Sequence, residues 1–298
     1  TNTFHLLIAE RDEQGAWRTL VRERIFVKLA EDGIAHIGPG AFERGLAALR
    51  HFRRELDAND ITPGSAPAYG TAALRTASNA ADFLRAVFEQ TGIRAQTIDG
   101  LREARLIFQG VRQAVPFPEN RVLVMDIGGG SVELILAEQD RVLRHQSFPV
   151  GVAVLFRRFH KSDPIAQPEI RAVERHLDEA LSGLWPMLEQ YPAPTLIGAA
   201  GAFDTIDNLL LDPATKPPLY GRVSVADFQK LYERVVHSTL AEREDWPLLA
   251  PERREMIVVG MVLIRHVLRR GGMTEILTSV YSMKEGMLAE AAYQNWKI

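Results

Sequence analysis

The sequence contains no cysteine among its 298 residues. Disulfide bonds, cysteine–metal sites and thiol catalysis are therefore excluded, and the composition fits a reducing cytoplasm. No apolar run approaches the roughly 18 residues of a membrane span, and no signal-peptide pattern opens the chain. The net charge is −3, so the chain lacks the general basic charge that nucleic-acid binding favours. An anionic substrate would have to be held by local groups.

The remaining composition is that of an ordinary globular protein, with 46% hydrophobic and 24% charged residues. A length of 298 residues suits two domains. Pro116 and Pro118 interrupt the chain between two segments, each of which patterns as a meander of strands followed by helices alternating with strands. We therefore predict an α/β protein with two related domains, residues 1–118 and 119–298, and a cleft between them. Ligands in such sheets bind beyond the carboxyl ends of the strands.

The strongest local motif is the segment from Asp126 to Glu133, which follows an apolar strand predicted at Val122–Met125. It holds three consecutive glycines, which permit positive φ and let backbone N–H groups crowd around an anion. A second strand follows at once, so the segment is neither a P-loop nor a dinucleotide-binding loop. The alternative is a glycine-rich hairpin turn between ordinary surface carboxylates, although a two-residue turn needs fewer glycines.

Three weaker motifs accompany it. Small residues at Gly198–Ala202 follow a strand predicted at Thr195–Ile197, and they permit either close approach to a ligand or tight packing of a helix on a strand. The opening segment Thr1–Thr3 is either the end of an anion-binding turn or a frayed terminus. Glu103 falls in the first turn of a helix predicted at 102–112. The helix dipole favours a carboxylate there, and a general base would look the same in the sequence.

Other catalytic classes lack the motifs they need. The eight histidines show no metal-ligand spacing. No Gly-x-Ser-x-Gly motif is present to support a serine-hydrolase triad.

Taken together and in order, the segments resemble the exopolyphosphatase/guanosine pentaphosphate phosphohydrolase (Ppx/GppA) family of the actin-like superfamily. The resemblance implies two actin-like (ribonuclease H-like) domains. It extends over almost the whole chain, through Thr1–Leu7, Gly70–Asn79, Gly100–Gly110, Val124–Leu134, Pro149–Gly151, Gly198–Gly201 and Ser282–Gly286.

The resemblance also implies roles for individual residues. Glu103 stands at the general-base position and would orient the water that attacks a terminal phosphorus. Asp126 and Glu133 would hold Mg²⁺, with Glu133 also acting in catalysis. The Arg75 guanidinium would grip phosphate or merely brace the fold. The residues expected to bind phosphate are Thr1, Asn2, Thr3, Arg75, Gly128, Gly129, Gly130, Ser131, Gly198 and Gly201.

The sequence departs from the family pattern in several places. Family members carry an Asp-x-Gly element just before the position of Thr1, so the first phosphate loop is cut short or incomplete here. Arg102 replaces a residue that is often acidic, and His5 stands where some members have Arg. The loop at Gly198–Gly201 is poorer in Gly and Thr than usual, and the C-terminal helical domain of longer members is missing.

The resulting expectation is a cytoplasmic, Mg²⁺-dependent exopolyphosphatase that releases terminal orthophosphate from inorganic polyphosphate. The alternatives are a guanosine pentaphosphate 5′-phosphohydrolase, a non-catalytic sensor of polyphosphate or guanosine tetraphosphate, and a sugar or acetate kinase of the same superfamily. No nucleic-acid or membrane partner is expected. The oligomeric state is left open, with a homodimer as the candidate assembly.

Overall fold

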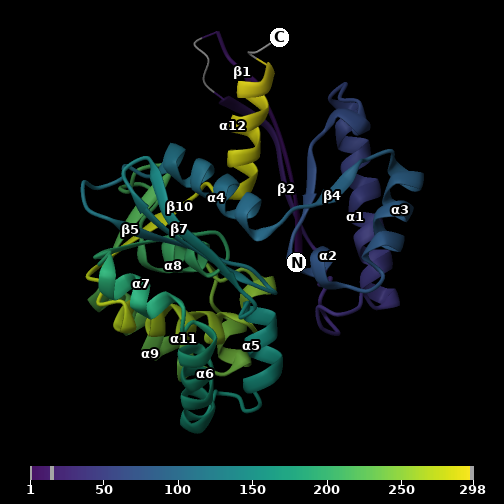
Figure 1. Ribbon diagram of the computed structural model, residues 1–298. Helices are drawn as coiled ribbons and strands as arrows, with labels where there is room; N and C mark the ends of the chain where they lie inside the picture. The colour runs from purple at the N-terminus through teal and green to yellow at the C-terminus, as the bar shows by residue number, and fades with distance from the viewer. Residues whose placement is uncertain (1, 14–16, 296–298) are drawn as a thin grey trace. The chain divides into compact units, whose positions relative to one another are not determined.

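The computed structural model describes residues 2–13 and 17–295. The chain forms two compact units, Thr1–Glu103 and Ala104–Ile298. Both units mix helices and strands (Figure 1), so the predicted α/β class is confirmed. In the described ranges no helix is both long enough and apolar enough to cross a membrane.

The division between the units lies inside helix α4 (Gly100–Ala114), ahead of the boundary predicted at residue 118. The helix continues unbroken through this point because its later turns supply Ile107 and Val111 to a core cluster of the second unit. The prolines that suggested the boundary follow the end of α4 and precede the first strand of the second unit.

The first unit opens with an antiparallel hairpin, as the alternation of apolar and polar residues predicts. Strand β1 (Thr3–Arg11) pairs with β2 (Trp17–Phe26), and the turn predicted between them lies partly outside the described residues. Helices α1 (Pro39–Ala58) and α3 (Ala80–Thr91) pack on each other. Their buried side chains and the inner face of the hairpin form the core of this unit.

The rest of the first unit differs from the sequence prediction in two details. The sequence pattern of residues 69–74 predicts a short strand end, but the structure divides it into β3 (Ala68–Gly70) and helix α2 (Ala72–Thr76). A Cβ atom on Gly70 would lie 2.4 Å from the Leu74 side chain, which folds back over the end of the strand. Ser78, just before an apolar helical stripe, is the cap that the sequence predicts for α3, and this is wrong because α3 begins after Asn79 without a side-chain cap. The remaining elements are η1 (Pro63–Ser65) and β4 (Ala95–Thr97), which pairs in parallel with β3.

The second unit is built on one six-stranded sheet with the order β7-β6-β5-β8-β10-β9. The first three strands form the predicted antiparallel meander, and β8 and β10 continue the sheet parallel to β5. Strand β9 closes the edge in the antiparallel sense. The bounds are β5 (Val122–Ile127), β6 (Val132–Glu138), β7 (Arg141–Phe148), β8 (Thr195–Ala199), β9 (Tyr220–Ser224) and β10 (Glu275–Ser279).

The sequence pattern of residues 168–190 predicts one long helix, but the structure has two, α6 (Gln167–Ala180) and α7 (Leu184–Gln190). Pro186 explains the break, because proline has no N–H for a hydrogen bond to the preceding turn and is tolerated only near a helix start. The cap predicted at Ser224 is confirmed, since its hydroxyl accepts from the Asp227 N–H. The helices are α5 (Val152–Phe159), α6 (Gln167–Ala180), α7 (Leu184–Gln190), α8 (Ala202–Leu210), α9 (Val225–Val236), α10 (Leu240–Glu244), η2 (Pro251–Arg253), α11 (Ile257–Arg270) and α12 (Met283–Asn295).

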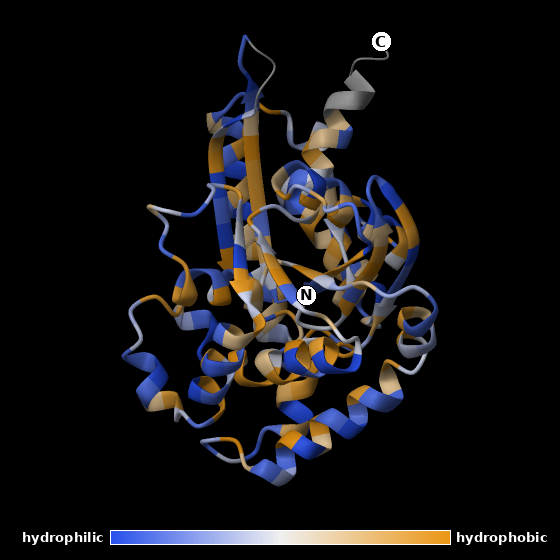
Figure 2. Cartoon of the chain, turned by 90° about the vertical axis from the view of Figure 1, so that its left-hand side faces the viewer, coloured by the Kyte–Doolittle hydropathy of each residue, from blue (hydrophilic) through white to orange (hydrophobic). Residues whose placement is uncertain are grey.

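The two faces of this sheet are covered by different helices. Residues such as Met125 and Leu134 face a large cluster that includes α6, α9 and α11, which gather on one side of the sheet in Figure 1. Val124 and Ile135 point to the opposite face, where the later turns of α4 pack. The helices show orange and blue stripes in Figure 2, whereas the inner strands are mostly orange. This matches a sheet that is buried on both faces.

We predict that the protein loses stability on mild acidification because of buried His266 on α11. Burial lowers the pKa of this imidazole, although Asp178 and Glu174 favour its charged form. As pH falls, His266 therefore takes up a proton in the unfolded chain before it does so in the folded protein. The contribution of the neutral imidazole to the free energy of unfolding is present above about pH 6.5 and is lost as pH falls toward the lower folded pKa. Urea unfolding between pH 7.5 and 5.5 should show a shallower pH slope in His266→Gln than in wild type. The exposed control His237→Gln should keep the wild-type slope.

Candidate functional site

Two carboxylates face each other in the second unit, where β5 ends and β6 begins. Asp126 and Glu133 are direct cross-strand partners in the antiparallel register. Such partners have Cβ atoms about 5 Å apart, and like charges at that separation destabilise a sheet unless something neutralises them. Glu133 is only 2% exposed, so solvent does little to screen the pair. The geometry therefore suits a divalent cation with oxygen ligands, such as Mg²⁺.

Hydroxyl groups fix both carboxylates. Ser131 and Ser147 donate hydrogen bonds of 2.8 and 2.7 Å to the same oxygen of Glu133, Oε1. The Ser282 hydroxyl, which precedes α12, donates to Asp126 Oδ2. Ser282 is itself held, because its backbone N–H donates to Glu285 Oε2 at 2.9 Å. The carboxylates are thus oriented from β7, from the loop between β5 and β6, and from the start of α12.

The glycine loop between the two carboxylates has its carbonyl groups occupied. The start of α5 donates to them, with Val152 N–H bonding Gly128 O at 3.0 Å and Ala153 N–H bonding Gly129 O at 2.9 Å. The Gly151 N–H bonds the Gly130 carbonyl at 3.2 Å. Across the ranges that the structure covers, the N–H groups of residues 129–131 donate no hydrogen bond. A run of N–H groups without acceptors is what an anion-binding loop requires.

The reason for glycine in this region differs from the one predicted. The three loop glycines do not use positive φ, which among the described glycines occurs at Gly33, Gly92, Gly201 and Gly272. Close packing is the visible constraint, since a Cβ atom on Gly151 would lie 2.4 Å from the carbonyl of Gly129. The loop and the first turn of α5 therefore pack backbone against backbone.

The second small-residue loop lies beside the first. Ala200 and Gly201 both have positive φ, and a Cβ atom on Gly201 would come within 2.8 Å of the Ile127 carbonyl at the end of β5. Gly198 lies within β8, where a Cβ atom would meet the Phe203 ring at 1.9 Å. Packing alone accounts for glycine at 198, and ligand binding by Gly198 and Gly201 stays a prediction.

Helix α12 is locked onto α4 by a contact between two glycines of the second unit. A Cβ atom on Gly286 would lie 1.8 Å from Leu106 O, and one on Gly110 would lie 1.9 Å from Ser282 O. This contact fixes the first turn of α12 and with it the hydroxyl of Ser282. Glu285 is buried, and its Oε1 atom lies 3.0 Å from Lys284 Nζ.

In the first unit, Glu103 is paired with Arg75. Arg75 Nη1 lies 2.6 Å from Glu103 Oε2 and 2.9 Å from the Ile98 carbonyl. Glu103 is 6% exposed and lies in the first turn of α4, where the Asp99 side chain accepts from the Arg102 N–H. Arg75 therefore braces the proposed base, and phosphate binding by its guanidinium stays a prediction.

The opening segment is partly accounted for by local structure. Thr1 lies outside the described residues, and Thr3 begins β1 opposite Phe26. Asn2 is buried; its carbonyl accepts from the N–H groups of Val27 and Lys28, and its side-chain oxygen accepts from Ala30 at 3.3 Å. Asn2 thus braces the segment after β2, and its proposed contact with phosphate is not tested.

Sequence reasoning missed the residues that orient the carboxylates. Ser147 lies one strand away from Glu133, and Ser282 lies 156 positions after Asp126. Ser147 lies in no motif, and although Ser282 opens the matching segment Ser282–Gly286, nothing in that segment points to Asp126. Gly151 and Gly286 lie in segments that resemble the family, but their reason, close backbone contact, is visible only in three dimensions.

Comparison with known proteins identifies the family and similar folds. Residues 7–294 match the model of the Ppx/GppA phosphatase family. The fold is similar to that of an exopolyphosphatase from Cytophaga hutchinsonii (TM-score 0.91, 36% identity, covering 97% of this chain and 94% of that one). It is also similar to the Aquifex aeolicus member of the Ppx/GppA family (TM-score 0.81, 21% identity, 99% and 95% covered) and to an exopolyphosphatase-like protein (TM-score 0.88, 23% identity, 99% and 97% covered).

We predict that Gly286→Ala destabilises the second unit by about 1–3 kcal/mol, because the added methyl group overlaps the Leu106 carbonyl in a packed interior. Urea unfolding measures the change. The control is Gly40→Ala on α1, where the methyl group would meet only the flexible end of Arg44. Its effect should stay within about 0.5 kcal/mol. Equal effects of the two substitutions would contradict the proposed role of the glycine contact.

Proposed function

Because the chain belongs to the Ppx/GppA phosphatase family, we propose that it is an exopolyphosphatase that releases terminal orthophosphate from inorganic polyphosphate. The observation that carries this proposal is the hairpin of β5 and β6. Its loop offers N–H groups to an anion, and its flanking carboxylates, Asp126 and Glu133, offer oxygen ligands to a cation. A phosphoanhydride with its metal ion needs both.

The choice of polyphosphate rests on the relatives. The Cytophaga hutchinsonii protein, which is 36% identical over nearly the whole chain, is an exopolyphosphatase. A guanosine pentaphosphate 5′-phosphohydrolase has the same requirements at the phosphate end, so the loop and carboxylates favour neither substrate. Because that relative is an exopolyphosphatase, we take polyphosphate as the first candidate substrate.

The proposed chemistry gives each of these residues a role. Glu103 takes a proton from the attacking water, and Arg75 keeps its carboxylate in one orientation. The N–H groups of residues 129–131 bind the terminal phosphate. Asp126 and Glu133 hold Mg²⁺, which neutralises negative charge on the phosphoanhydride when bound. Ser131, Ser147 and Ser282 keep these two carboxylates oriented.

The function is tested by following orthophosphate release from long-chain polyphosphate and from guanosine pentaphosphate, each with Mg²⁺. A higher kcat/KM for polyphosphate supports the proposal. A higher value for guanosine pentaphosphate would assign the alternative activity. Binding of either compound without release would make the protein a sensor and would contradict the proposed hydrolysis.

We predict that Glu103→Gln lowers kcat for polyphosphate by roughly 10²–10⁴, the usual contribution of a general base. Glutamine keeps the size of the side chain and can still contact Arg75, so polyphosphate binding should persist. The matched control is Glu89→Gln on the exposed face of α3, which should leave kcat unchanged. If Glu103→Gln retains most of the wild-type turnover, the assignment of the base is wrong.

We predict that Ser282→Ala weakens Mg²⁺ binding by roughly 10-fold or more, because groups that orient a metal ligand typically contribute that much. The Mg²⁺ concentration that gives half-maximal activity should rise, and Mn²⁺ binding followed by electron paramagnetic resonance should weaken in parallel. Turnover at saturating Mg²⁺ should recover, since no ligand atom is removed. Exposed Ser65→Ala serves as the control. An unchanged metal dependence would show that Asp126 does not need this hydroxyl.

A further inference from the structure

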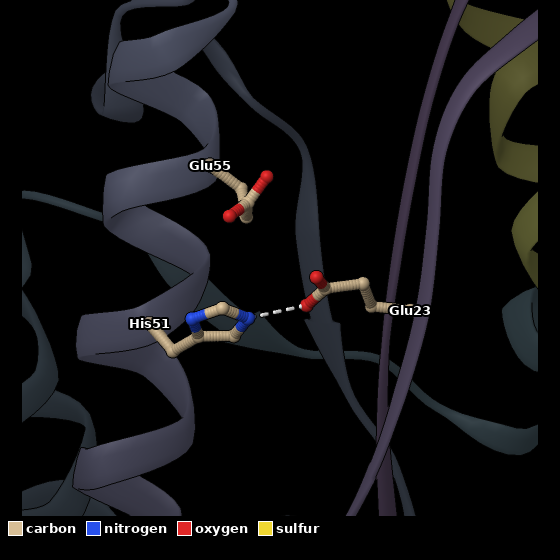
Figure 3. Close-up of side chains that lie close together, drawn as sticks. All are labelled: Glu23, His51 and Glu55. Atoms are coloured by element: carbon tan, nitrogen blue, oxygen red, sulfur yellow. Dashed lines mark hydrogen bonds and ion pairs between the residues drawn. The ribbon is translucent and has the colours of Figure 1, made fainter.

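A histidine and two glutamates converge in the first unit, away from the residues given catalytic roles. Glu23 lies on β2, while His51 and Glu55 lie one turn apart on α1 (Figure 3). Each residue offers one ligand atom, and the three atoms lie within 4.8 Å of one another. His51 Nε2 is 2.7 Å from Glu23 Oε2, and both side chains are about one-third exposed (34% and 29%).

The position of Glu23 breaks the pattern of its strand. Val21 and Ile25, two residues to either side, point inward and pack on the core of the unit. Leu6, the partner of Glu23 on β1, also packs on that core. Residues at this spacing share one face of a strand, so Glu23 places a carboxylate where the pattern calls for an apolar side chain. An inward carboxylate is costly unless it has a partner of opposite charge.

Glu55 adds a second carboxylate to the same place. Its backbone carbonyl accepts from Asn59, but within the described ranges its carboxylate makes no hydrogen bond or ion pair. Figure 3 shows the Glu55 carboxylate beside the His51 ring and facing the side on which Glu23 lies. Two carboxylates thus approach one imidazole, and of the two only Glu23 is hydrogen-bonded to the ring. Arg54 supplies one positive charge at the other ring nitrogen, so these side chains still carry more negative than positive charge, which a divalent cation would offset.

We propose that Glu23, His51 and Glu55 form a binding site for a divalent transition-metal ion, with Zn²⁺ as the best match. One imidazole and two carboxylates suit zinc, which takes three protein ligands and a water, whereas Mg²⁺ prefers oxygen ligands alone. Ligand atoms around tetrahedral zinc lie about 3.3 Å apart, given bonds of about 2.1 Å. Small rotations of the three partly exposed side chains bring the ligand atoms to that spacing.

One neighbour must move when zinc binds. Arg54 Nη2 lies 3.3 Å from His51 Nδ1 and donates to it, so the ring proton sits on Nε2 and is shared with Glu23. Zinc at Nε2 shifts that proton to Nδ1, where it repels the guanidinium. Arg54 is exposed and can withdraw into solvent. The bound ion would then tie β2 to α1 and stabilise the first unit.

The site is tested on the full, metal-free chain by titrating Zn²⁺ against a chromophoric chelator. To remove any contribution from the phosphate-loop carboxylates, the experiment is repeated in an Asp126→Asn background. We expect one zinc site per chain in both backgrounds, weakened at least 10-fold by Glu55→Gln. Glu55→Gln removes no contact from the metal-free protein, so its folding should be unaffected. Mg²⁺ at equal concentration should not displace the zinc.

Thermal unfolding provides a readout that does not depend on activity. Zinc at about 100 times its dissociation constant should raise the midpoint of the wild-type transition by roughly 5–10 °C. The rise should fall to about half or less in Glu55→Gln and His51→Gln, because 10-fold weaker binding leaves zinc at only about 10 times its dissociation constant. The matched control is His237→Gln, directly after α9. There Nδ1 lies 3.7 Å from Glu233 Oε2, and among the described residues no second carboxylate joins the pair. Zinc binding that is absent in wild type, or undiminished in Glu55→Gln, would overturn the proposal.

Discussion

The pairing of Asp126 with Glu133 across β5 and β6 sets two carboxylates about 5 Å apart on a sheet face otherwise lined with apolar side chains. A packed interior offers such groups little solvation, so every neighbouring polar group has to contribute. Serine hydroxyls from three separate segments donate to the pair. The glycine contact between α4 and α12 fixes the first turn of α12 and so positions one of these hydroxyls.

In the same hairpin, the backbone carbonyl groups and the backbone N–H groups of the loop have different roles. The first N–H groups of α5 would otherwise lack partners, and they are satisfied by the carbonyls of the glycine loop. These hydrogen bonds occupy the carbonyl groups of the glycine loop, while the N–H groups of residues 129–131 stay available to an anion. The proposed anion site therefore lies in the four-residue connection, and the carboxylates of the proposed cation site flank it on the paired strands.

The first unit handles its inward-facing carboxylates in two ways. Glu103 is held by an arginine that also bonds a backbone carbonyl, so its charge is balanced and its orientation fixed. Glu23 and Glu55 approach one imidazole, whose other ring nitrogen contacts Arg54, so two carboxylates face one guanidinium. Protein metal sites differ from ordinary ion pairs in this respect, because the protein supplies an excess of negative ligands and the ion supplies the compensating charge.

The sequence by itself determined the α/β class, the antiparallel hairpin at the start, the meander of β5, β6 and β7, and the importance of the segment from Asp126 to Glu133. Local periodicity or a contiguous motif predicts each of these features. Tertiary structure alone decided the partners of the carboxylates and the meeting of Glu23 with α1. Ser282 and Asp126 are 156 positions apart, and Glu23 and His51 are 28 apart. Side chains so far apart in sequence become neighbours only when strands and helices pack, so no local pattern records them.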